Sequence, residues 1–245
     1  FLIGDLEGDT LDGGAGVDTL TGGRGNDVYL FNTNDVVSGE SIIESTGGGT
    51  DAIAIVTSTD FTNISVASFD EIEEIRFAGA SQVGTVTGGH LSGEVIDLTE
   101  TVAGISELVI NVSAGSTVDF SNLSASTFTI GSDIVTINVE NGDASITLPN
   151  FTVTLNMGTG PSDDTLIGGS GPDTLDGKVG NDTITGAGGA DILIGGSGND
   201  LFLFNTNDVA AGEYITENVG GGTDVIVIVT STNFANMTVA SFDEI

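Results

Sequence analysis

The stretch that decides the fold is IGGSGPDTLDGKVGNDTITGAGGADILIGGSGNDLFLF, at residues 167–204. Four of its aspartates recur every nine residues, and a glycine-rich loop precedes each of them: Asp173, Asp182, Asp191 and Asp200. The repeating unit is G-G-x-G-x-D-x-U-x, in which U is a large apolar residue. Repetition of this fidelity is a strong signal of a repeat architecture, where a single copy would be weak.

The same nine-residue unit occurs at the start of the chain. Asp9, Asp18 and Asp27 stand in phase there, and Asp164 extends the later array by one step. Every U position holds a large apolar side chain: Leu11, Leu20, Tyr29, Leu166, Leu175, Ile184, Leu193 and Phe202. Successive side chains of a strand point to opposite faces. We therefore predict three-residue strands in which these eight residues point inward.

A longer period is superimposed on the nine-residue one. Residues 25–44 return at 198–217, and 57–72 return at 230–245, so that Asp27 corresponds to Asp200 at an offset of 173 residues. This predicts tandem duplication of a larger unit, of which the chain holds one full copy and the start of a second. The expected organisation is an array at 1–30, a β-solenoid segment at 31–158 with a degenerate repeat at 46–54, an array at 159–203, and the second unit beginning at 204–245.

Between the arrays the sequence changes to short β-branched runs that alternate with period two. They lie at 108–112, 117–120, 127–130, 133–139, 145–148 and 152–155. These runs predict short strands, and no stretch shows a helical stripe. A sandwich would fit this segment alone, but the flanking arrays favour continued coiling. The predicted fold is all-β, with parallel β-roll arrays continuous with a right-handed parallel β-helix or solenoid.

Composition excludes several classes of protein. The 245 residues include 36 Asp and Glu against 3 Lys and Arg, a formal net charge of −33. Three basic residues cannot neutralise a phosphate backbone, so nucleic acid is not expected as a partner. No apolar stretch approaches the ~20 residues of a membrane-spanning helix, so membrane insertion is not expected. The chain has no cysteine, which excludes disulfides, zinc–thiolate sites and thiol nucleophiles.

The nonapeptide pattern points to a hard metal ion. Two nonapeptides make one coil, and each coil buries only two large side chains, too few to offset the ordering of its backbone. Aspartates stacked at the spacing of neighbouring strands also repel one another. With carboxylate and backbone oxygens available and His90 the single histidine, the ligands suit calcium better than zinc, copper or magnesium. We expect folding to be coupled to the binding of several calcium ions.

The two arrays resemble the RTX, or haemolysin-type calcium-binding, repeats found in large secreted bacterial surface proteins. The resemblance covers residues 4–30 and 159–203. It implies that each ion lies between loops two repeats apart and takes backbone carbonyls and the position-six aspartate from both loops. One such ion would lie between the loops that end at Asp173 and Asp191, and another between those that end at Asp182 and Asp200.

The ligands that the resemblance implies come from both arrays. In the first array they are Asp9, Gly14, Gly16, Asp18, Gly22, Gly23, Arg24, Gly25 and Asp27, with Asp5 and Glu7 beside Asp9. In the second array they are Gly160, Ser162, Asp164, Gly169, Gly171, Asp173, Gly177, Lys178, Val179, Gly180, Asp182, Gly186, Ala187, Gly188, Gly189, Asp191, Gly195, Gly196, Ser197, Gly198 and Asp200. Lys178 replaces a glycine, so its carbonyl serves only if its φ allows.

A degenerate repeat with a longer preceding loop adds further ligands. It contributes Gly48 and Asp51, and its copy in the second unit contributes Gly221 and Asp224. The intervening loop is six residues too long for one coil of two nonapeptides, which sets this repeat apart from the others.

Other polar residues favour structural interpretations over functional ones. Asp35 and its copy Asp208 favour a side-chain-stabilised turn. Glu40 and Glu44, repeated as Glu213 and Glu217, favour surface charges. His90 is expected in a turn without a role. The segment SFDEIEEI at 68–75 favours a strand with an acidic solvent face over a paired-carboxylate active site.

The favoured function is a structural one, a calcium-rigidified spacer or stalk in an adhesin or surface-layer-type protein. The resemblance implies type I secretion and a secreted, extracellular or bacterial cell-surface location, with calcium and adjacent tandem units of the same chain as partners. The external ligand stays open. An enzyme is not expected, because a β-helix polysaccharide lyase needs a basic catalytic residue and neither Arg76 nor Lys178 has a suitable carboxylate spacing.

An accessory carbohydrate- or ice-binding module is the second alternative. Outward threonines form partial ladders at Thr10, Thr19, Thr165, Thr174 and Thr183. Val28 and Ile192 interrupt these ladders, and threonine is also a common strand residue.

Overall fold

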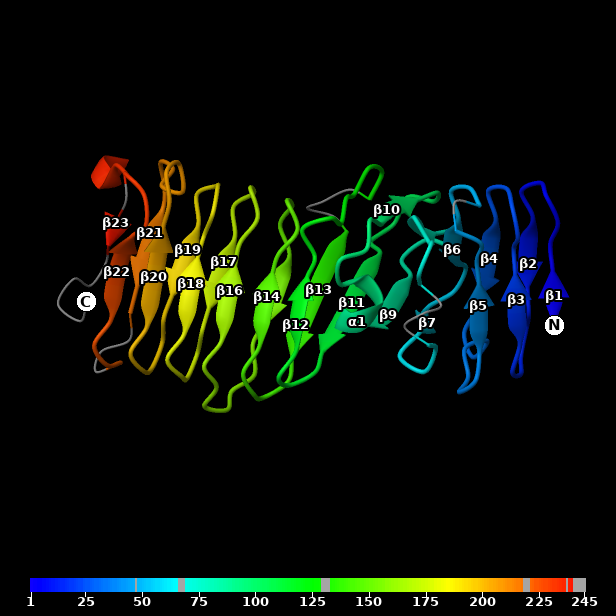
Figure 1. Cartoon of the computed structure of the whole chain (residues 1–245), viewed down its shortest axis with the longest axis horizontal. Helices are drawn as coiled ribbons and strands as arrows, with labels where there is room; N and C mark the ends of the chain where they lie inside the picture. The colour runs from blue at the N-terminus through cyan, green and yellow to red at the C-terminus, as the bar shows by residue number, and fades with distance from the viewer. Residues whose placement is uncertain (47, 66–68, 129–132, 218–220, 237, 240–245) are drawn as a thin grey trace. The chain divides into compact units, whose positions relative to one another are not determined.

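The computed structural model describes residues 1–245 except 47, 66–68, 129–132, 218–220, 237 and 240–245. The chain divides into two compact units, Phe1–Asn111 with Asn122–Val135 and Val112–Ser121 with Thr136–Ile245. Each unit is built from short parallel strands that pair with the strand one coil away (Figure 1). The prediction of an all-β, parallel solenoid is confirmed.

The first unit contains three sets of parallel strands. Its strands are β1 (Leu2–Ile3), β2 (Thr10–Asp12), β3 (Thr19–Thr21), β4 (Val28–Phe31), β5 (Ser41–Ile43), β6 (Ala52–Ile55), β7 (Thr59–Asp60), β8 (Glu74–Phe77), β9 (Val83–Thr87), β10 (Asp97–Glu100) and β11 (Glu107–Val112). They pair in the orders β1-β3-β5, β10-β8-β6-β4-β2 and β11-β9-β7. One short helix, α1 (Gly88–Leu91), follows β9.

The second unit repeats this construction. Its strands are β12 (Thr117–Asp119), β13 (Ile134–Val139), β14 (Ser145–Thr147), β15 (Thr154–Asn156), β16 (Thr165–Ile167), β17 (Thr174–Asp176), β18 (Thr183–Thr185), β19 (Ile192–Ile194), β20 (Leu201–Phe204), β21 (Tyr214–Thr216), β22 (Val225–Ile228) and β23 (Thr238–Val239). They pair in the orders β12-β14-β16-β18-β20-β22 and β17-β19-β21-β23, and β13 pairs with β15. A 3-10 turn, η2, spans Phe234–Asn236.

The strand register shows that two nonapeptides make one coil. Leu166 pairs with Ile184, and Leu175 pairs with Leu193, so neighbouring strands repeat every 18 residues. All eight U residues are buried: Leu11, Leu20, Tyr29, Leu166, Leu175, Ile184, Leu193 and Phe202. Their stack forms the apolar interior of each array, as the alternation predicts.

The coil that leads to the degenerate repeat, which we call the longer coil, has 24 residues from Asp27 to Asp51 and still keeps the strand register. Its extra residues form a turn outside the strands. In the first unit Leu20 pairs with Ile42, although 22 residues separate them. The loop between β4 and β5 closes where the Asn32 N–H donates to Asp35 Oδ2 at 2.6 Å. Asn205 and Asp208 form the same contact at 2.6 Å in the second unit. The turn interpretation of both aspartates is confirmed.

The segment between the arrays follows the predicted strands with two corrections. Strands occur at 108–112, 117–119, 134–139 and 145–147 as expected, but β15 begins only at Thr154. The run at 127–130 was predicted as a strand, yet Thr127 and Phe128 form a bend and 129–130 lie outside the described residues. Phe128 is buried against Phe77, with ring centroids 5.2 Å apart. The side chain of Phe128 therefore packs in the core although its backbone forms a bend and not a strand.

The acidic segment SFDEIEEI is also not the strand that its alternation predicts. Ser68 lies outside the described residues, Asp70 and Glu71 form a turn, and β8 starts at Glu74. Glu71 has a φ of 64°. The left-handed backbone at this position reverses the chain before the strand, which alternation alone does not reveal.

His90 is buried and lies in the short helix α1, where the sequence predicts a turn in which this residue has no role. Its ring stacks on Phe69 with centroids 4.5 Å apart, and its Nδ1 accepts the Thr87 N–H at 3.1 Å. Burial lowers the pKa of this imidazole. The other described helical segment is η2, and neither is long and apolar enough to cross a membrane.

The thin core makes a direct prediction for stability. Leu193 is 0% exposed, whereas its neighbour Ile192 is 41% exposed. We expect Leu193→Ala to lower the free energy of unfolding by about 2–5 kcal/mol through cavity formation. Ile192→Ala, the matched control, should cost less than about 1 kcal/mol. Urea unfolding in saturating calcium measures both, and equal losses would contradict the inward placement of the U residues.

Candidate metal sites

The position-six aspartates of the second array form a column linked by hydrogen bonds. The Asp164 N–H donates to Asp182 Oδ1 at 2.7 Å, and the Asp182 N–H donates to Asp200 Oδ1 at 2.7 Å. The Asp200 N–H continues the series to Asp224 Oδ1 at 2.8 Å. Each carboxylate thus uses one oxygen to hold the backbone of the preceding coil.

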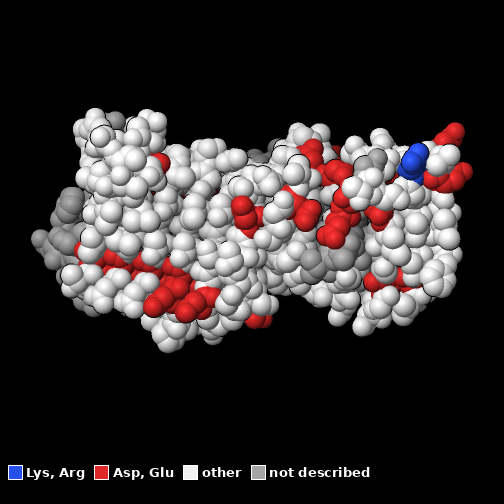
Figure 2. Space-filling view, viewed as in Figure 1, with Lys and Arg blue, Asp and Glu red and all other residues white. Residues whose placement is uncertain are grey.

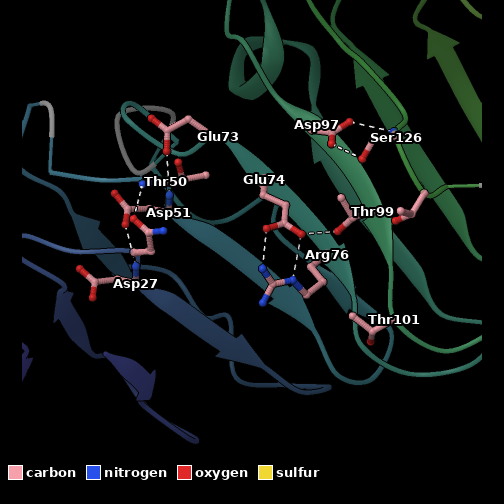
Figure 3. Close-up of polar contacts among 12 residues, drawn as sticks. Asp27, Thr50, Asp51, Glu73, Glu74, Arg76, Asp97, Thr99, Thr101 and Ser126 are labelled. Atoms are coloured by element: carbon pink, nitrogen blue, oxygen red, sulfur yellow. Dashed lines mark hydrogen bonds and ion pairs between the residues drawn. The ribbon is translucent and has the colours of Figure 1, made fainter. Parts of the chain in front are cut away.

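The other loop edge and the first array repeat this arrangement. In the second array the Asp173 N–H donates to Asp191 Oδ1 at 2.9 Å, and the Asp191 N–H donates to Glu213 Oε2 at 3.2 Å. In the first array the series are Asp9, Asp27, Asp51 and Glu73 (2.7, 2.8 and 2.7 Å) and Asp18 with Glu40 (3.1 Å). Figure 3 shows Asp27, Asp51 and Glu73 joined in this way. We call each such series a carboxylate column.

The second oxygen of many column carboxylates is buried without a partner. Among the described residues these atoms are Asp27 Oδ2, Asp173 Oδ1, Asp182 Oδ2, Asp191 Oδ2, Asp200 Oδ2, Glu213 Oε1 and Asp224 Oδ2. A buried carboxylate oxygen without a donor or cation carries a large desolvation penalty. The protein supplies no basic side chain to these positions, because the described side-chain ion pairs join Arg76 to Glu74 and Lys178 to Asp176. A bound cation would satisfy these oxygens.

Loop carbonyls border the same spaces as the aspartates. A Cβ on Gly177 would collide with Asp182 Oδ2 and lie 2.8 Å from the Gly195 carbonyl oxygen. A Cβ on Gly168 would likewise meet Asp173 Oδ2 and the Gly186 carbonyl oxygen. In the first array Gly4 lies in the same way beside Asp9 Oδ2 and the Gly22 carbonyl. The structure therefore brings together three aspartate–carbonyl pairs that the resemblance to RTX repeats places on shared ions.

Other predicted carbonyl ligands accept hydrogen bonds between neighbouring loops. They are Gly169, Lys178, Val179, Ser197, Gly48 and Gly221, whose donors are the N–H groups of Gly188, Ser197, Ser162, Gly180, Gly25 and Gly198. A carbonyl oxygen has two lone pairs, so these bonds leave one for an ion.

The glycine positions of the loops are needed because the loops stack closely. A Cβ on any of seven glycines with positive φ would meet the backbone of the loop one coil earlier: Gly23, Gly25, Gly180, Gly189, Gly196, Gly198 and Gly222. For Gly189 that backbone atom is the carbonyl of Gly171. Lys178 (φ 74°) and Ala187 (φ 61°) adopt the same left-handed backbone without being glycine. Lys178 therefore has the left-handed φ that its place in the loop requires if its carbonyl is to serve as a ligand.

The ends of the arrays differ from their centres. Gly14 and Gly16 have positive φ and face open space, and the side chain of Asp18 is 19% exposed. The Arg24 N–H donates to the Asp5 carbonyl at 3.1 Å. The loop of Gly14 and Gly16 therefore lacks a stacked neighbour on its open side, whereas the loop of Arg24 lies between Asp5 and Gly48.

The first loop of the second array is hydrogen-bonded within itself and to the segment that precedes the array. The Ser162 hydroxyl donates to Asp164 Oδ2 at 3.1 Å, and the Gly160 N–H donates to Asn141 Oδ1 at 2.9 Å. Both Asp164 oxygens have partners, because Oδ1 accepts the Ala144 N–H at 2.8 Å. Asp164 is therefore less dependent on a cation than the aspartates that follow it.

Sequence reasoning missed the glutamates of the longer coil. Glu40 and Glu213 are 3% and 0% exposed and stand in the columns, so the surface-charge interpretation is wrong for them. It is wrong for Glu217 as well, which is 8% exposed, and Glu44 is half-buried. The available signal was spacing: the glutamates flank a three-residue strand in E-S-I-I-E and E-Y-I-T-E.

Arg76 and Lys178 are each paired with a carboxylate. Arg76 Nε lies 2.9 Å from Glu74 Oε1, and the Thr99 hydroxyl donates to the same oxygen (Figure 3). Burial raises the pKa of Glu74, but these hydrogen bonds outweigh it and leave that pKa lowered. Lys178 contacts Asp176. These ion pairs leave the expectation that neither base has a carboxylate spacing suited to a lyase untested. Figure 2 shows that acidic side chains far outnumber basic ones among the charged groups of the visible face.

Burial makes four of these carboxylates hard to ionise without a cation. It raises the pKa of Asp182 to about 7 and that of Asp191 to about 6, with neighbouring carboxylates adding to the effect. The pKa values of Glu213 and Glu217 rise to about 8 and about 7 for the same reasons. The metal-free columns therefore favour protons, and a divalent cation would replace them.

Comparison with known proteins supports this chemistry. A family model described as the RTX calcium-binding nonapeptide repeat, in four copies, matches residues 1–30, 159–188 and 167–202. Comparisons with curated proteins and with solved structures gave no match.

The raised pKa values predict how acidity affects the metal-free protein. Carboxylates with a folded pKa above the unfolded one bind more protons when folded, so metal-free folding should gain stability as pH falls from about 8 to about 5. The calcium-saturated protein, whose carboxylates are ionised, should change little over that window. Circular dichroism at stepped pH measures both. Glu213→Gln should weaken the metal-free response, and a metal-free signal that grows with rising pH would contradict it.

A substitution in a column tests its role in ion binding. Asp182→Asn keeps an acceptor for the Asp164 N–H but removes the charge, so we expect the calcium midpoint of folding to rise about tenfold or more. Asp163→Asn is the matched control, because Asp163 is exposed and its Oδ1 accepts the Asn181 N–H at 2.7 Å. Equal midpoints in the two variants, measured by calcium titration, would count against the site.

Proposed function

We propose that this chain is a structural module that folds and stiffens as calcium fills its carboxylate columns, because residues 1–30 and 159–202 match the family model of the RTX calcium-binding nonapeptide repeat. The observation that carries the proposal is the set of buried carboxylate oxygens without partners, from Asp27 to Asp224. Oxygen-only donors of this kind suit calcium, which accepts six to eight oxygens in irregular geometry.

The ions would lie between loops two repeats apart. Asp173 with the Gly186 carbonyl, Asp182 with the Gly195 carbonyl and Asp9 with the Gly22 carbonyl supply the first ligands, since each pair borders one space. The remaining loop carbonyls and the next aspartate of the column would complete each shell. Binding neutralises like charges that otherwise repel across neighbouring coils.

We propose that folding follows calcium. The core of each coil is limited to U residues such as Leu175 and Leu193, and a chain of net charge −33 repels itself when no cation is bound. Such a chain would stay extended where calcium is scarce and fold where it is abundant, as in secretion to the outside of a bacterial cell.

A spacer or stalk in an adhesin or surface-layer-type protein is the role that this construction supports best. Solenoid units in series build length, and the long coil occurs once in each unit, with Asp51 and Asp224 at corresponding positions. An ice-binding ladder is less well supported, because Thr174 pairs with Ile192. A lyase is less well supported because Arg76 and Lys178 are engaged by carboxylates.

A calcium titration followed by circular dichroism tests the proposal. We expect the β-signal to appear with a midpoint of about 10⁻⁴–10⁻³ M calcium, the range of extracellular modules. Magnesium at the same concentrations should not replace it, because it prefers regular octahedral sites. A β-signal of full intensity in excess chelator would reject calcium-coupled folding.

A further inference from the structure

The longer coil places a third carboxylate against two aspartates of a column, once in each unit. In the first unit one carboxylate oxygen from each of Asp27, Glu44 and Asp51 lies within 4.8 Å of the other two. In the second unit Asp200, Glu217 and Asp224 do the same. Two oxygens on one calcium ion, each at 2.3–2.6 Å, are at most about 5 Å apart. Both clusters therefore have the size of a single coordination shell.

The strand register explains how the glutamates reach these positions. β5 pairs with β3 so that Ile43 lies opposite Thr21, which puts Glu44 opposite Gly22. β21 pairs with β19 so that Thr216 lies opposite Ile194, which puts Glu217 opposite Gly195. Each glutamate thus occupies the place of the first glycine of a nonapeptide. That position offers a backbone carbonyl elsewhere in the arrays, and here it also carries a carboxylate.

The aspartates direct unpartnered oxygens at the same space. Asp27, Asp200 and Asp224 are 0%, 2% and 3% exposed, and the Oδ2 of each has no hydrogen-bond partner. A Cβ on Gly195 would meet Asp200 Oδ2 and Glu217 Oε1 together. A Cβ on Gly22 would meet Asp27 Oδ2 and Glu44 Oε1 together. The glutamate and the free aspartate oxygen therefore face one point in both units.

The two glutamates are held by different donors. Glu217 accepts the Gly195 N–H at 2.9 Å and the Gly196 N–H at 3.0 Å. Glu44 accepts the hydroxyl of Tyr29, a residue replaced by Phe202 in the other copy. A cleft of about 400 Å³, lined in part by Glu44, Asp70 and Glu71, opens beside the first cluster and gives an ion a route from solvent.

We infer that each longer coil holds a calcium ion in a three-carboxylate site, Asp27–Glu44–Asp51 in one unit and Asp200–Glu217–Asp224 in the other. The inference rests on the proposed calcium-binding function and extends it. A shell with three carboxylates binds calcium more tightly than one with two aspartates and carbonyls, because ligand charge sets calcium affinity. These sites would fill first and join each array to the coil that follows it.

Terbium, which replaces calcium and luminesces when a nearby tyrosine is excited, tests the first site directly. The chain has no tryptophan and two tyrosines, so a Tyr214→Phe background leaves Tyr29 as the single donor. We expect sensitised luminescence at the lowest terbium concentrations that bind. Glu44→Gln should weaken this binding about tenfold or more, while Glu140→Gln, an exposed control, should not.

Equilibrium dialysis against calcium tests both sites without relying on the tyrosine. At a calcium concentration that just fills these two tightest sites of the parent chain, Glu44→Gln and Glu217→Gln should each bind about one ion fewer, and the double variant about two fewer. Tyr29→Phe should lose sensitised luminescence but keep its calcium. Unchanged stoichiometry and terbium binding in the glutamate variants of a chain that still folds with calcium would overturn this inference alone. A parent chain that binds no calcium would overturn the proposed function as well.

Discussion

The structure depends on how carboxylates are stacked in its interior. Parallel coils place the position-six side chains of Asp164, Asp182 and Asp200 above one another, and each gives one oxygen to the backbone N–H of the coil before it. That bond sets the coil register, but it also leaves a second oxygen buried. Negative charges at this spacing repel strongly in a partly desolvated setting. The same column is therefore the framework of the metal-free fold and its greatest electrostatic cost, which a cation between the coils would remove.

Because strand pairing keeps its register, the column continues through the longer coil, whose sequence departs from the nonapeptide repeat. The coil from Asp27 to Asp51 has 24 residues in place of 18, yet the Asp27 N–H still meets Asp51 Oδ1 at 2.8 Å. The extra residues leave as a turn closed by Asp35, outside the strands that carry the column. Glutamate reaches further than aspartate, so Glu40 and Glu213 keep their columns intact where the local backbone differs. Columns thus tolerate insertions as long as strand pairing is retained.

Prediction from sequence succeeded where the repeat is strict and failed where contacts are distant. The inward U residues, the two-nonapeptide coil and the aspartate columns follow from a nine-residue period with Tyr29 and Leu193 as typical interior positions. The burial of Glu40, Glu213 and Glu217 did not follow, because a single acidic residue near a turn most often lies in solvent. The bend at Phe128 and the helical turn at His90 were not predicted either. Each depends on packing against a residue distant in sequence, Phe77 for Phe128 and Phe69 for His90.

By itself the sequence determined the parallel solenoid, its coil length and the cysteine-free, acidic loops whose ligands suit a hard cation. Period and composition suffice for these, because every coil repeats the same local choice of glycine turn, aspartate and apolar residue. Only the tertiary structure decided which oxygens share a space, which of them lack partners, and how Glu44 and Glu217 come opposite glycines of the previous coil. These features depend on pairing between residues 22 positions apart. The strict repeat has a spacing of 18, so the nine-residue period does not predict which residues of the longer coil come together.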